Sequence, residues 1–275
     1  MNNLQQKLNH LKWLKAAGIT YYCSERKDSK NSLIKELNNR HALPMDLPVI
    51  TQPAPIMKKE TGIQNESLAV AKARTLANNA TTLAALKEAV EQFDGCDLKK
   101  FANNTVFADG VLGAKILLIG EAPGATEDEQ GIPFCGESGQ LLDKMLEAIG
   151  ISRTKNAYIT NTIFWRPPAN RKPTNEEINI CKPFVEKHIA LINPKLIILV
   201  GSTAATSLLG KYDGITNLRQ NNYSYTNQYL AAPIHRTSLF HPAYLLRQPM
   251  QKKTTWYDLL KIKAFIEESV DQPPQ

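Results

Sequence analysis

The sequence has few cysteines, and no two of them form a closely spaced pair. The 275 residues include only Cys23, Cys96, Cys135 and Cys181. A zinc ribbon needs cysteines two residues apart, and a small secreted domain needs a dense disulfide framework, so neither class fits. We expect free thiols in a reducing cytoplasm.

Long apolar runs are also absent. No stretch approaches the roughly 18 apolar residues that a membrane-spanning helix requires. The first 19 residues alternate apolar and polar side chains at helical spacing, whereas a secretory signal peptide has a continuous apolar centre. We therefore expect a cytoplasmic protein that has no membrane partner.

Charge of one sign does not dominate the sequence. Lysine and arginine together number 33 and aspartate and glutamate 26, which gives a formal net charge of +7. An excess of this size favours an anionic partner such as nucleic acid, although many basic proteins bind none. With 43% hydrophobic residues, the chain can bury a core in one large domain or two small ones.

The sequence is predicted to divide into a leader and a larger domain. Residues 3–17 have leucines at helical spacing, whereas residues 23–65 lose this periodicity and include four prolines. Residues 67–93 are rich in alanine and leucine, which predicts one or two helices with a break at Asn78 and Asn79. We expect a helical leader with a flexible linker over residues 1–90 and a catalytic domain over 91–270.

Strands and helices are predicted to alternate after residue 100. Buried strands are expected at 115–120, 156–168 and 194–201, and a further strand begins near residue 232. Helices are expected at about 138–149, 174–192, 202–210 and 252–268. This alternation predicts a three-layer α/β/α sandwich with a mainly parallel central sheet, preceded by the helical leader.

Three loops that follow predicted strands hold unusual side chains. They span residues 121–136, 161–171 and 241–247. The carboxyl ends of parallel strands lie at one edge of a sheet, so these loops are expected to converge there. The first loop carries several carboxylates and one phenylalanine, and taken alone it also fits an ordinary solvated acidic loop.

The three loops together resemble a known family. GEAPGATEDEQGIPFCGESGQLLDKML, ITNTIFWRPPANRKPT and HPAYLLRQP, in this order, are similar to the three motifs of the uracil-DNA glycosylase superfamily. The similarity is closest to family 4, in a subgroup with a helical leader, and it covers about residues 90–265. It implies an enzyme that flips uracil out of DNA and hydrolyses its N-glycosidic bond to leave an abasic site.

The resemblance assigns roles in holding the base and stabilising its departure. Phe134 would stack on uracil, and the amide of Asn161 would pair with O4 and N3–H. His241 would donate to O2 of the departing uracil, where charge develops in the transition state. A backbone N–H in the turn from Ala122 to Gly124 would add a second donor.

A carboxylate is expected on the sugar side of the scissile bond. Glu121 would stabilise the positively charged sugar and orient water, by the logic of glycoside hydrolysis. The best-known branch of the superfamily has an aspartate one position later, where this chain has Ala122. Glu127 and Asp128 are also motif residues, with loop hydrogen bonding as the equal alternative.

The third loop is expected to contact DNA. By resemblance, Tyr244, Leu245 or Leu246 would enter the minor groove and fill the space that the flipped nucleotide leaves. Core packing is the alternative role for the two leucines. Arg247 and Lys252 would meet phosphates, which predicts salt-sensitive binding.

The chain departs from family 4 at the iron–sulfur ligands. The family usually holds a four-iron, four-sulfur cluster with four cysteines, and Cys96 and Cys181 stand at two of these positions as remnants. Lys99 and Trp165 stand at the other two. We therefore expect no cofactor and no metal, with Trp165 filling the vacated space as part of the core.

Three functions remain open from the sequence. The first is a monomeric uracil-DNA glycosylase without a lyase step, since no lysine is evident at the site. The second is a non-catalytic DNA-binding accessory of repair or of a polymerase that keeps the uracil pocket, which Ala122 and the missing ligands favour. The third is a hydrolase of small nucleotides or nucleosides on the same scaffold.

Overall fold

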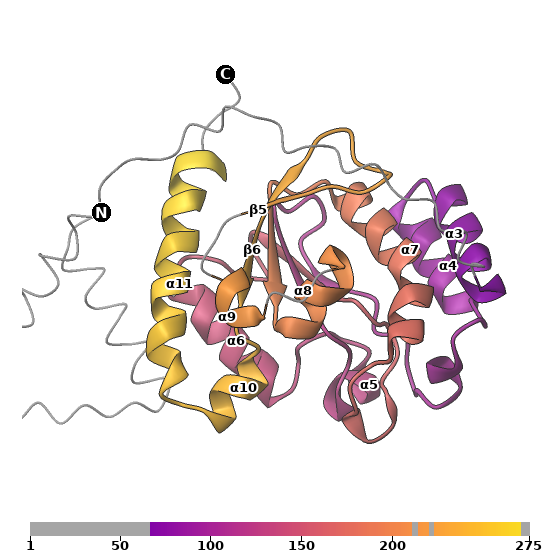
Figure 1. The fold of residues 1–275 in the computed structure, drawn as a ribbon, viewed down its shortest axis with the longest axis horizontal. Coiled ribbons are helices and arrows are strands. Elements are labelled where there is room, and N and C mark those ends of the chain that lie inside the picture. The colour runs from indigo at the N-terminus through magenta and orange to yellow at the C-terminus, as the bar shows by residue number, and fades with distance from the viewer. Residues whose placement is uncertain (1–66, 211–213, 220–222, 271–275) are drawn as a thin grey trace, which may run out of the picture. The chain divides into compact units, whose positions relative to one another are not determined.

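The computed structural model describes residues 67–210, 214–219 and 223–270. The predicted helix at 3–17 and the predicted linker at 23–65 lie outside the described residues. The described part has a central sheet with helices on both faces (Figure 1). The predicted fold class, a three-layer sandwich with a mainly parallel sheet, is confirmed.

The sheet has the strand order β1-β3-β2-β4-β6-β5. Its parallel centre consists of β3 (Ala157–Asn161), β2 (Ile116–Gly120), β4 (Leu196–Val200) and β6 (Ile234–Leu239). Two short strands, β1 (Asp109–Gly110) and β5 (Tyr223–Tyr225), pair antiparallel at the two edges. Every residue of β2, β3 and β4 is buried, as expected for strands that are covered on both faces.

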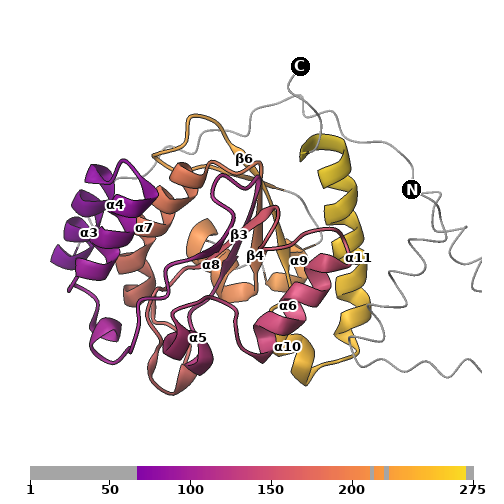
Figure 2. The same cartoon turned by 180° about the vertical axis from the view of Figure 1, so that it is seen from behind.

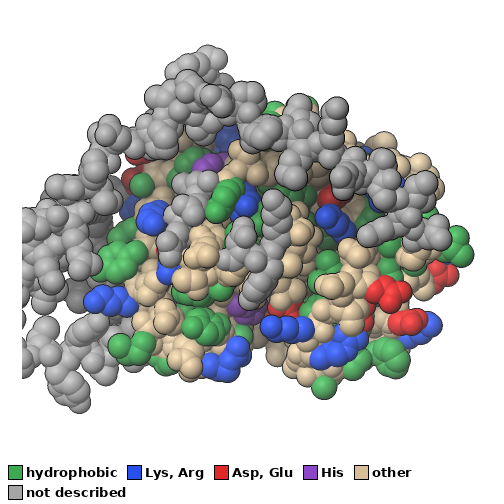
Figure 3. All heavy atoms as spheres, viewed as in Figure 1, with side chains coloured by type: hydrophobic (Ala, Val, Ile, Leu, Met, Phe, Trp, Pro, Cys, Tyr) green, Lys and Arg blue, Asp and Glu red, His purple; other side chains and the backbone are tan. Residues whose placement is uncertain are grey.

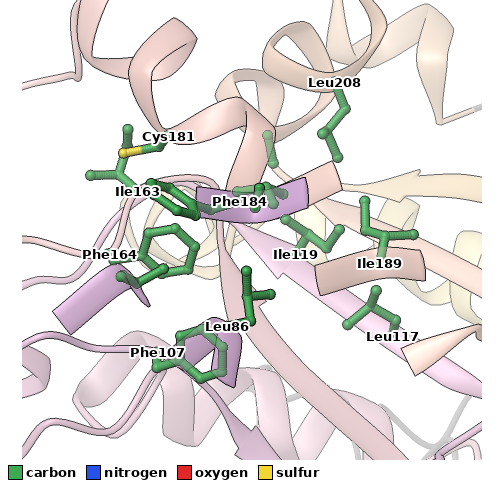
Figure 4. Close-up of a cluster of buried hydrophobic side chains, with 14 of the residues drawn as sticks. Leu86, Phe107, Leu117, Ile119, Ile163, Phe164, Cys181, Phe184, Ile189 and Leu208 are labelled. Atoms are coloured by element: carbon green, nitrogen blue, oxygen red, sulfur yellow. The ribbon is translucent and has the colours of Figure 1, made fainter. Parts of the chain in front are cut away.

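One face of the sheet is covered by α3 (Leu68–Asn79), α4 (Leu83–Gln92), α7 (Asn175–Ile192) and α8 (Ser202–Leu209). Leu117 and Ile119 of β2 point to this side and pack with Leu86, Phe184 and other side chains of the helices (Figure 4). Successive residues of a strand face opposite sides of the sheet, so this core receives alternate residues of β2.

The opposite face is covered by α6 (Glu137–Glu147), α10 (Pro242–Arg247) and α11 (Gln251–Phe265), as Figure 2 shows from behind. Ile116 and Leu118 of β2 point to this side and pack with Leu142, Leu245 and Leu259. The remaining elements are α5 (Ala125–Gln130), α9 (Ile215–Leu218), the 3-10 turns η1 (Asp97–Lys100) and η2 (Pro168–Asn170), and the π-helical turn η3 (Ile266–Val270).

The predicted helical region 67–93 is two helices, α3 and α4, and the first ends at Asn79 where a break is expected. Ser67 and Thr82 cap their amino ends by accepting hydrogen bonds from backbone N–H groups, which explains where each helix begins. Both helices belong to the core next to α7, with Ala73 and Leu86 fully buried. The domain boundary expected near residue 90 stays a prediction.

Two loop assignments are wrong in detail. Residues 125–130, predicted as loop, form α5, and residues 242–247, also predicted as loop, form α10. Both helices have only six residues, too few for a helical period to be visible in the sequence. No helix in the described ranges combines the length and apolarity needed to cross a membrane.

Candidate active site

The three motifs meet at the carboxyl edge of the sheet. Gly120 ends β2, Asn161 ends β3, and the two residues lie opposite each other in the parallel register. His241 follows β6 after Leu239 and Phe240 and precedes the first residue of α10. The predicted convergence is thus a consequence of strand order, because β3, β2, β4 and β6 end at one edge.

Phe134 and Asn161 approach each other over the backbone of Gly120. A Cβ atom at Gly120 would lie 2.4 Å from Asn161 Oδ1 and 2.4 Å from Phe134 Cζ. Both side chains are buried, with exposed fractions of 2% for Asn161 and 6% for Phe134. A side chain at position 120 would therefore fill the space that the ring and the amide now occupy.

His241 joins this pair from the other side. Its ring centroid lies 5.8 Å from that of Phe134, at an interplanar angle of 33°. It packs over Gly201, whose φ of +96° favours glycine and where a Cβ would lie 3.0 Å from His241 Cβ. A stacking ring, an amide and an imidazole thus gather in one place, next to two glycines.

The imidazole of His241 has a defined proton arrangement. Nδ1 accepts a hydrogen bond of 3.2 Å from the N–H of Ala243, so the neutral ring carries its proton on Nε2. Burial lowers the pKa of His241 below its ordinary value, and the nearby negative charge of Glu121 opposes part of this change. His241 is therefore a neutral hydrogen-bond donor through Nε2 at neutral pH.

The backbone of Glu121 is held by the second motif. Its carbonyl oxygen accepts hydrogen bonds from Thr162 Oγ1 at 2.6 Å and from the N–H of Ile163 at 3.1 Å. The side chain is half-buried, and it lies close enough to His241 to influence its pKa. A carboxylate and an imidazole are thus placed at the same edge of the sheet.

Glu127 joins two turns of the first motif. Its Oε2 accepts from the N–H of Gly124 at 3.1 Å, and its Oε1 accepts from the N–H of Gly136 at 2.9 Å. The N–H of Gly124 is therefore used within the protein, and Pro123 has none. Of the predicted second donors in this turn, the N–H of Ala122 is the one left.

Asp128 is buried, at 1% exposed, and bonded within the protein. Its Oδ1 accepts from the N–H groups of Asn103 and Asn104 at 2.8 and 3.2 Å, and its Oδ2 accepts from Asn103 Nδ2 at 3.0 Å. These bonds attach α5 to the segment that precedes β1. Loop hydrogen bonding, the alternative role expected for Glu127 and Asp128, is what both carboxylates do here.

The residues predicted to contact DNA differ in how much of each side chain is exposed to solvent. Tyr244 and Leu246 are partly exposed and Arg247 is exposed, whereas Leu245 is completely buried in the core next to α6. Lys252 is only 7% exposed, and burial lowers its pKa. The helical turns of α10 and α11 explain the differences, because consecutive residues of a helix point in different directions.

Basic side chains gather near this edge of the sheet. Figure 3 shows Lys and Arg side chains, with some Asp and Glu side chains among them, along the lower margin of the molecule, the side on which α5 and α10 lie in Figure 1. Met250, between α10 and α11, is 84% exposed at the same end of α10. Basic side chains are therefore available at this margin for contacts with phosphates.

Within the described residues, Cys96, Cys135 and Cys181 do not form the family's four-thiolate site. A hydrogen bond between the thiols of Cys96 and Cys181 lowers the pKa of Cys96 and, together with burial, raises that of Cys181. Cys135, in the first motif, is apart from this pair in the fold, at the amino end of α6. No group of three or more His, Cys, Asp or Glu side chains within the described ranges is arranged to hold a metal ion.

Lys99 and Trp165 occupy the positions of the other two ligands with bonds of their own. Lys99 Nζ donates to the carbonyl of Phe93 at 2.9 Å and to that of Glu91, at the carboxyl end of α4. Trp165 is fully buried, stacks with Phe93 at a centroid distance of 6.5 Å, and donates from Nε1 to Thr105 Oγ1 at 2.9 Å. These residues do not fit an iron–sulfur cluster.

Two residues that the sequence analysis missed reach the site loops. Thr162 donates a hydrogen bond to the carbonyl of Glu121. Its position directly after Asn161 is the sequence signal that could have identified it. Arg153 donates to the carbonyl of Phe134 at 2.8 Å from a turn between α6 and β3. Nothing in the local sequence around Arg153 indicates this contact, since it depends on how α6 packs.

A cavity of about 600 Å³ lies elsewhere, at the amino edge of the sheet. Its lining includes Ile116 at the start of β2, Gly150 after α6, and Lys263 and Val270 near the carboxyl end. None of the converging motif residues lines it. The candidate site is therefore defined by the side chains described above and is distinct from this cavity.

Comparisons with known proteins agree with the motifs. A family model described as "Uracil DNA glycosylase superfamily" matches residues 107–261. The type-4 uracil-DNA glycosylase of Thermotoga maritima is 36% identical over 66% of this chain and 93% of its own length, and that of Sulfurisphaera tokodaii is 35% identical over 66% and 84%. A protein named DNA polymerase from Bacillus phage SP01 is 27% identical over 62% of this chain but only 18% of its own length. The family model covers more than half of this chain, and the chain therefore belongs to the uracil DNA glycosylase superfamily.

Proposed function

We propose that this protein is a monofunctional uracil-DNA glycosylase, which removes uracil from DNA and leaves an abasic site. The observation that carries the proposal is the convergence of Phe134, Asn161 and His241 at the edge of the sheet. The similarity to type-4 uracil-DNA glycosylases supports the same activity.

The first step is recognition of a base that has left the helix. The ring of Phe134 offers a flat surface on which uracil stacks. The Asn161 amide has one acceptor and two donors, so Oδ1 accepts from N3–H of uracil and Nδ2 donates to O4. Cytosine has an acceptor at N3 and a donor at C4, the reverse pattern, so an amide in this orientation rejects it.

The second step is cleavage of the bond between N1 of uracil and C1′ of the sugar. The bonding electrons leave with uracil, and negative charge builds up on O2. We expect the Nε2–H of neutral His241 to donate to O2 and the N–H of Ala122 to add a second hydrogen bond. Donors that act on charge developed only in the transition state raise the rate, by about 100 to 1,000-fold for one donor.

The third step is capture of the sugar cation by water. The carboxylate of Glu121 stabilises positive charge at C1′ and orients the water whose hydroxyl adds there, while the water's second proton passes to the departing uracil. The proposed site residues, Glu121, Phe134, Asn161 and His241, include no lysine, the residue that forms a Schiff base with an abasic sugar. The reaction therefore ends at the abasic site.

DNA binding places the third motif at the duplex. Tyr244 and Leu246, the partly exposed apolar residues of α10, fill the space left by the flipped nucleotide, and Arg247 meets phosphate. Lys253 is exposed next to the buried Lys252 and is the better phosphate contact of the two. The protein acts as a monomer in this proposal, which size-exclusion chromatography with light scattering tests.

The protein is proposed to work without an iron–sulfur cluster. The bonds of Lys99 and Trp165 support this, because they fill the ligand positions with an anchored ammonium group and a packed indole. Protein purified without oxygen is expected to be colourless. The broad visible absorption of a cluster, or stoichiometric iron and sulfide, would contradict the proposal.

The activity is tested with single- and double-stranded oligonucleotides that carry one uracil. After treatment with the wild-type protein, alkali should cleave the strand at the uracil position. Treatment with the protein and no alkali should leave the strand intact. Glu121→Ala combined with His241→Ala should abolish base release. The absence of release by the wild type, or full activity of the double variant, would reject the proposal.

A second candidate is a non-catalytic DNA-binding accessory protein. Two observations favour it: Ala122 stands where one branch of the superfamily has aspartate, and a similar segment forms part of a protein named DNA polymerase. Such a protein would bind uracil-containing DNA in a salt-dependent manner and release no base. The oligonucleotide assay, run beside a binding assay, separates the two candidates.

A further inference from the structure

Arg153 lies outside the three motifs, in the turn between α6 and β3, and contacts the loop that carries Phe134. Its Nη2 donates to the main-chain carbonyl of Phe134 at 2.8 Å, and its Nη1 donates to that of Pro133 at 2.9 Å. The side chain is only 14% exposed. One guanidinium group thus binds two successive carbonyls of the turn that carries the proposed stacking ring.

Two carboxylates fix the guanidinium group in place. Asp143 Oδ1, on α6, accepts from Nε at 3.0 Å and from Nη2 at 2.9 Å, and Asp109 Oδ2, on β1, accepts from Nη1 at 3.0 Å. With the two carbonyls, these bonds use all five N–H groups of Arg153. The planar fork therefore has a single orientation, set by a helix and an edge strand.

Phe134 has a backbone conformation that needs such support. Its φ is +52°, in the left-handed region that bulky residues rarely adopt. Its carbonyl also packs against α6, because a Cβ at Gly139 would lie 1.7 Å from Phe134 O. Unfavourable backbone conformations persist only where neighbouring groups hold them, and they cluster at functional sites.

We propose that Arg153 is a positioning residue for uracil recognition. By binding the carbonyls of Pro133 and Phe134, it holds the Phe134 ring above Gly120 in the orientation that stacks on the flipped base. This inference rests on the proposed uracil-DNA glycosylase activity. A ring that is fixed before the substrate arrives loses no freedom on binding, whereas a displacement of about 1 Å costs roughly 100-fold in rate.

The first test is Arg153→Lys, which keeps the positive charge but cannot bind both carboxylates and both carbonyls. We expect kcat/KM for uracil release from single-stranded DNA to fall about tenfold or more, and inhibition by free uracil to weaken. Affinity for the same strand without uracil should not change. The control is Arg74→Lys on α3, which covers the other face of the sheet and should leave all three quantities unchanged.

The second test asks whether Arg153 acts through Phe134. In a Phe134→Leu background, Arg153→Lys should cause little further loss, because the ring that it positions is gone. An equal fold loss in both backgrounds, with a lowered unfolding temperature, would show a general structural role and overturn the inference. Unchanged kinetics and uracil inhibition in Arg153→Lys would overturn it as well.

If Arg153→Lys does not fold, Asp143→Asn provides a milder form of the same test. It keeps the size of the side chain and weakens the partner that orients the guanidinium group, so a smaller loss of the same kind is expected. An equal fold loss from Asp143→Asn in the wild-type and Phe134→Leu backgrounds would again overturn the inference. A wild-type protein that releases no uracil would reject the proposed function, whereas an active wild type with normal Arg153 and Asp143 variants rejects only this inference.

Discussion

The proposed stacking and pairing side chains meet over a residue that has no side chain. Gly120 ends β2 within a buried strand, and the space beside its Cα is occupied by the ring of Phe134 and the amide of Asn161. Its main-chain carbonyl accepts from the N–H of Thr162, which ties the first motif to the second. At the scale of single residues, the site depends as much on this glycine as on the groups that perform the chemistry.

Gly120→Ala should lower uracil release by about 100-fold, because the added methyl group displaces Phe134 or Asn161. Gly136→Ala, in the same motif, should cause a smaller loss, since its Cβ would lie 3.2 Å from Glu127 Oε1, a tight contact that a small shift of this side chain relieves. Single-turnover kinetics and thermal unfolding of both variants measure the effect. Equal activity of the two variants would contradict the proposed position of the base.

His188 makes the stability of the protein depend on pH. It is fully buried between Phe107 and Tyr158, and burial lowers its pKa to about 3 from 6.5. The neutral ring is favoured in the folded state, so this contribution is complete above pH 6.5 and is lost as the pH falls toward 3. Each pH unit in this window costs about 1.4 kcal/mol.

His188→Gln should therefore flatten the pH dependence of unfolding. Between about pH 7 and pH 5, the wild type should lose roughly 2 kcal/mol more than the variant, as measured by urea denaturation. Glutamine keeps a polar group within reach of the Tyr158 hydroxyl, which bonds to His188 Nε2 at 3.1 Å. Parallel pH profiles for the two proteins would show that His188 does not cause the acid sensitivity.

At the scale of elements, short helices decide which motif residues face outward. The third motif is α10, and its turn directs Leu245 into the core while Tyr244 and Leu246 remain partly exposed. A loop over the same residues would not impose this alternation. The same reasoning applies to α5, where Asp128 is buried by its contacts with Asn103 and Asn104.

Leu245→Ala and Leu246→Ala form a matched pair on α10. Leu245→Ala should lower the free energy of unfolding by about 2 to 5 kcal/mol, because it leaves a cavity beneath the helix. Leu246 is only partly buried, so Leu246→Ala should lower stability less, and it should lower uracil release from duplex more than from single-stranded DNA. Equal losses on both substrates would argue against a wedge at Leu246.

Trp165 stands at a position where the family has a cluster ligand, and its ring packs against Phe93, which follows α4, and against Phe164. Trp165→Ala should lower the free energy of unfolding by about 3 to 5 kcal/mol. Phe101→Ala is the control, because this aromatic side chain is 70% exposed and its loss should change stability by about 0.5 kcal/mol or less. Similar effects of the two changes in chemical denaturation would show that Trp165 carries no packing role.

At the scale of the whole molecule, α3 and α4 belong to the same core as the sheet. Ala73, Ala77, Leu86 and Val90 are completely buried, in a cluster that includes Leu117 of β2. Figure 1 shows both helices beside α7. A catalytic domain that begins near residue 91 would have to fold with this side of α7 exposed to water.

Two truncations test where the catalytic domain begins. Removal of residues 1–90 takes away α3 and α4, so we expect a large loss of stability or no soluble protein. Removal of residues 1–66 keeps both helices and is expected to leave the unfolding temperature and uracil release close to those of the full chain. A stable, active product of the longer truncation would place the boundary near residue 90.

The sequence by itself determined the fold class and the motif residues at the centre of the site. Alternation of apolar strands with capped helices specified a parallel sheet, and parallel strands bring their carboxyl-end loops to one edge. That Glu121, Phe134, Asn161 and His241 lie together at this edge was predictable on this ground and from the family resemblance, whereas their roles stay predictions. The break between α3 and α4 was predictable too, because caps and turn residues act locally.

Only the tertiary structure decided which side chains are available and what holds them. Leu245 and Lys252 are buried. The carboxylates of Glu127 and Asp128 accept hydrogen bonds from backbone N–H groups of nearby loops, and Arg153 donates to the carbonyl of Phe134. Each outcome depends on contacts between segments distant in sequence, or on the direction in which a short helix points its side chains. Local pattern carries no information about such contacts, because burial and hydrogen bonding are settled when the layers pack together.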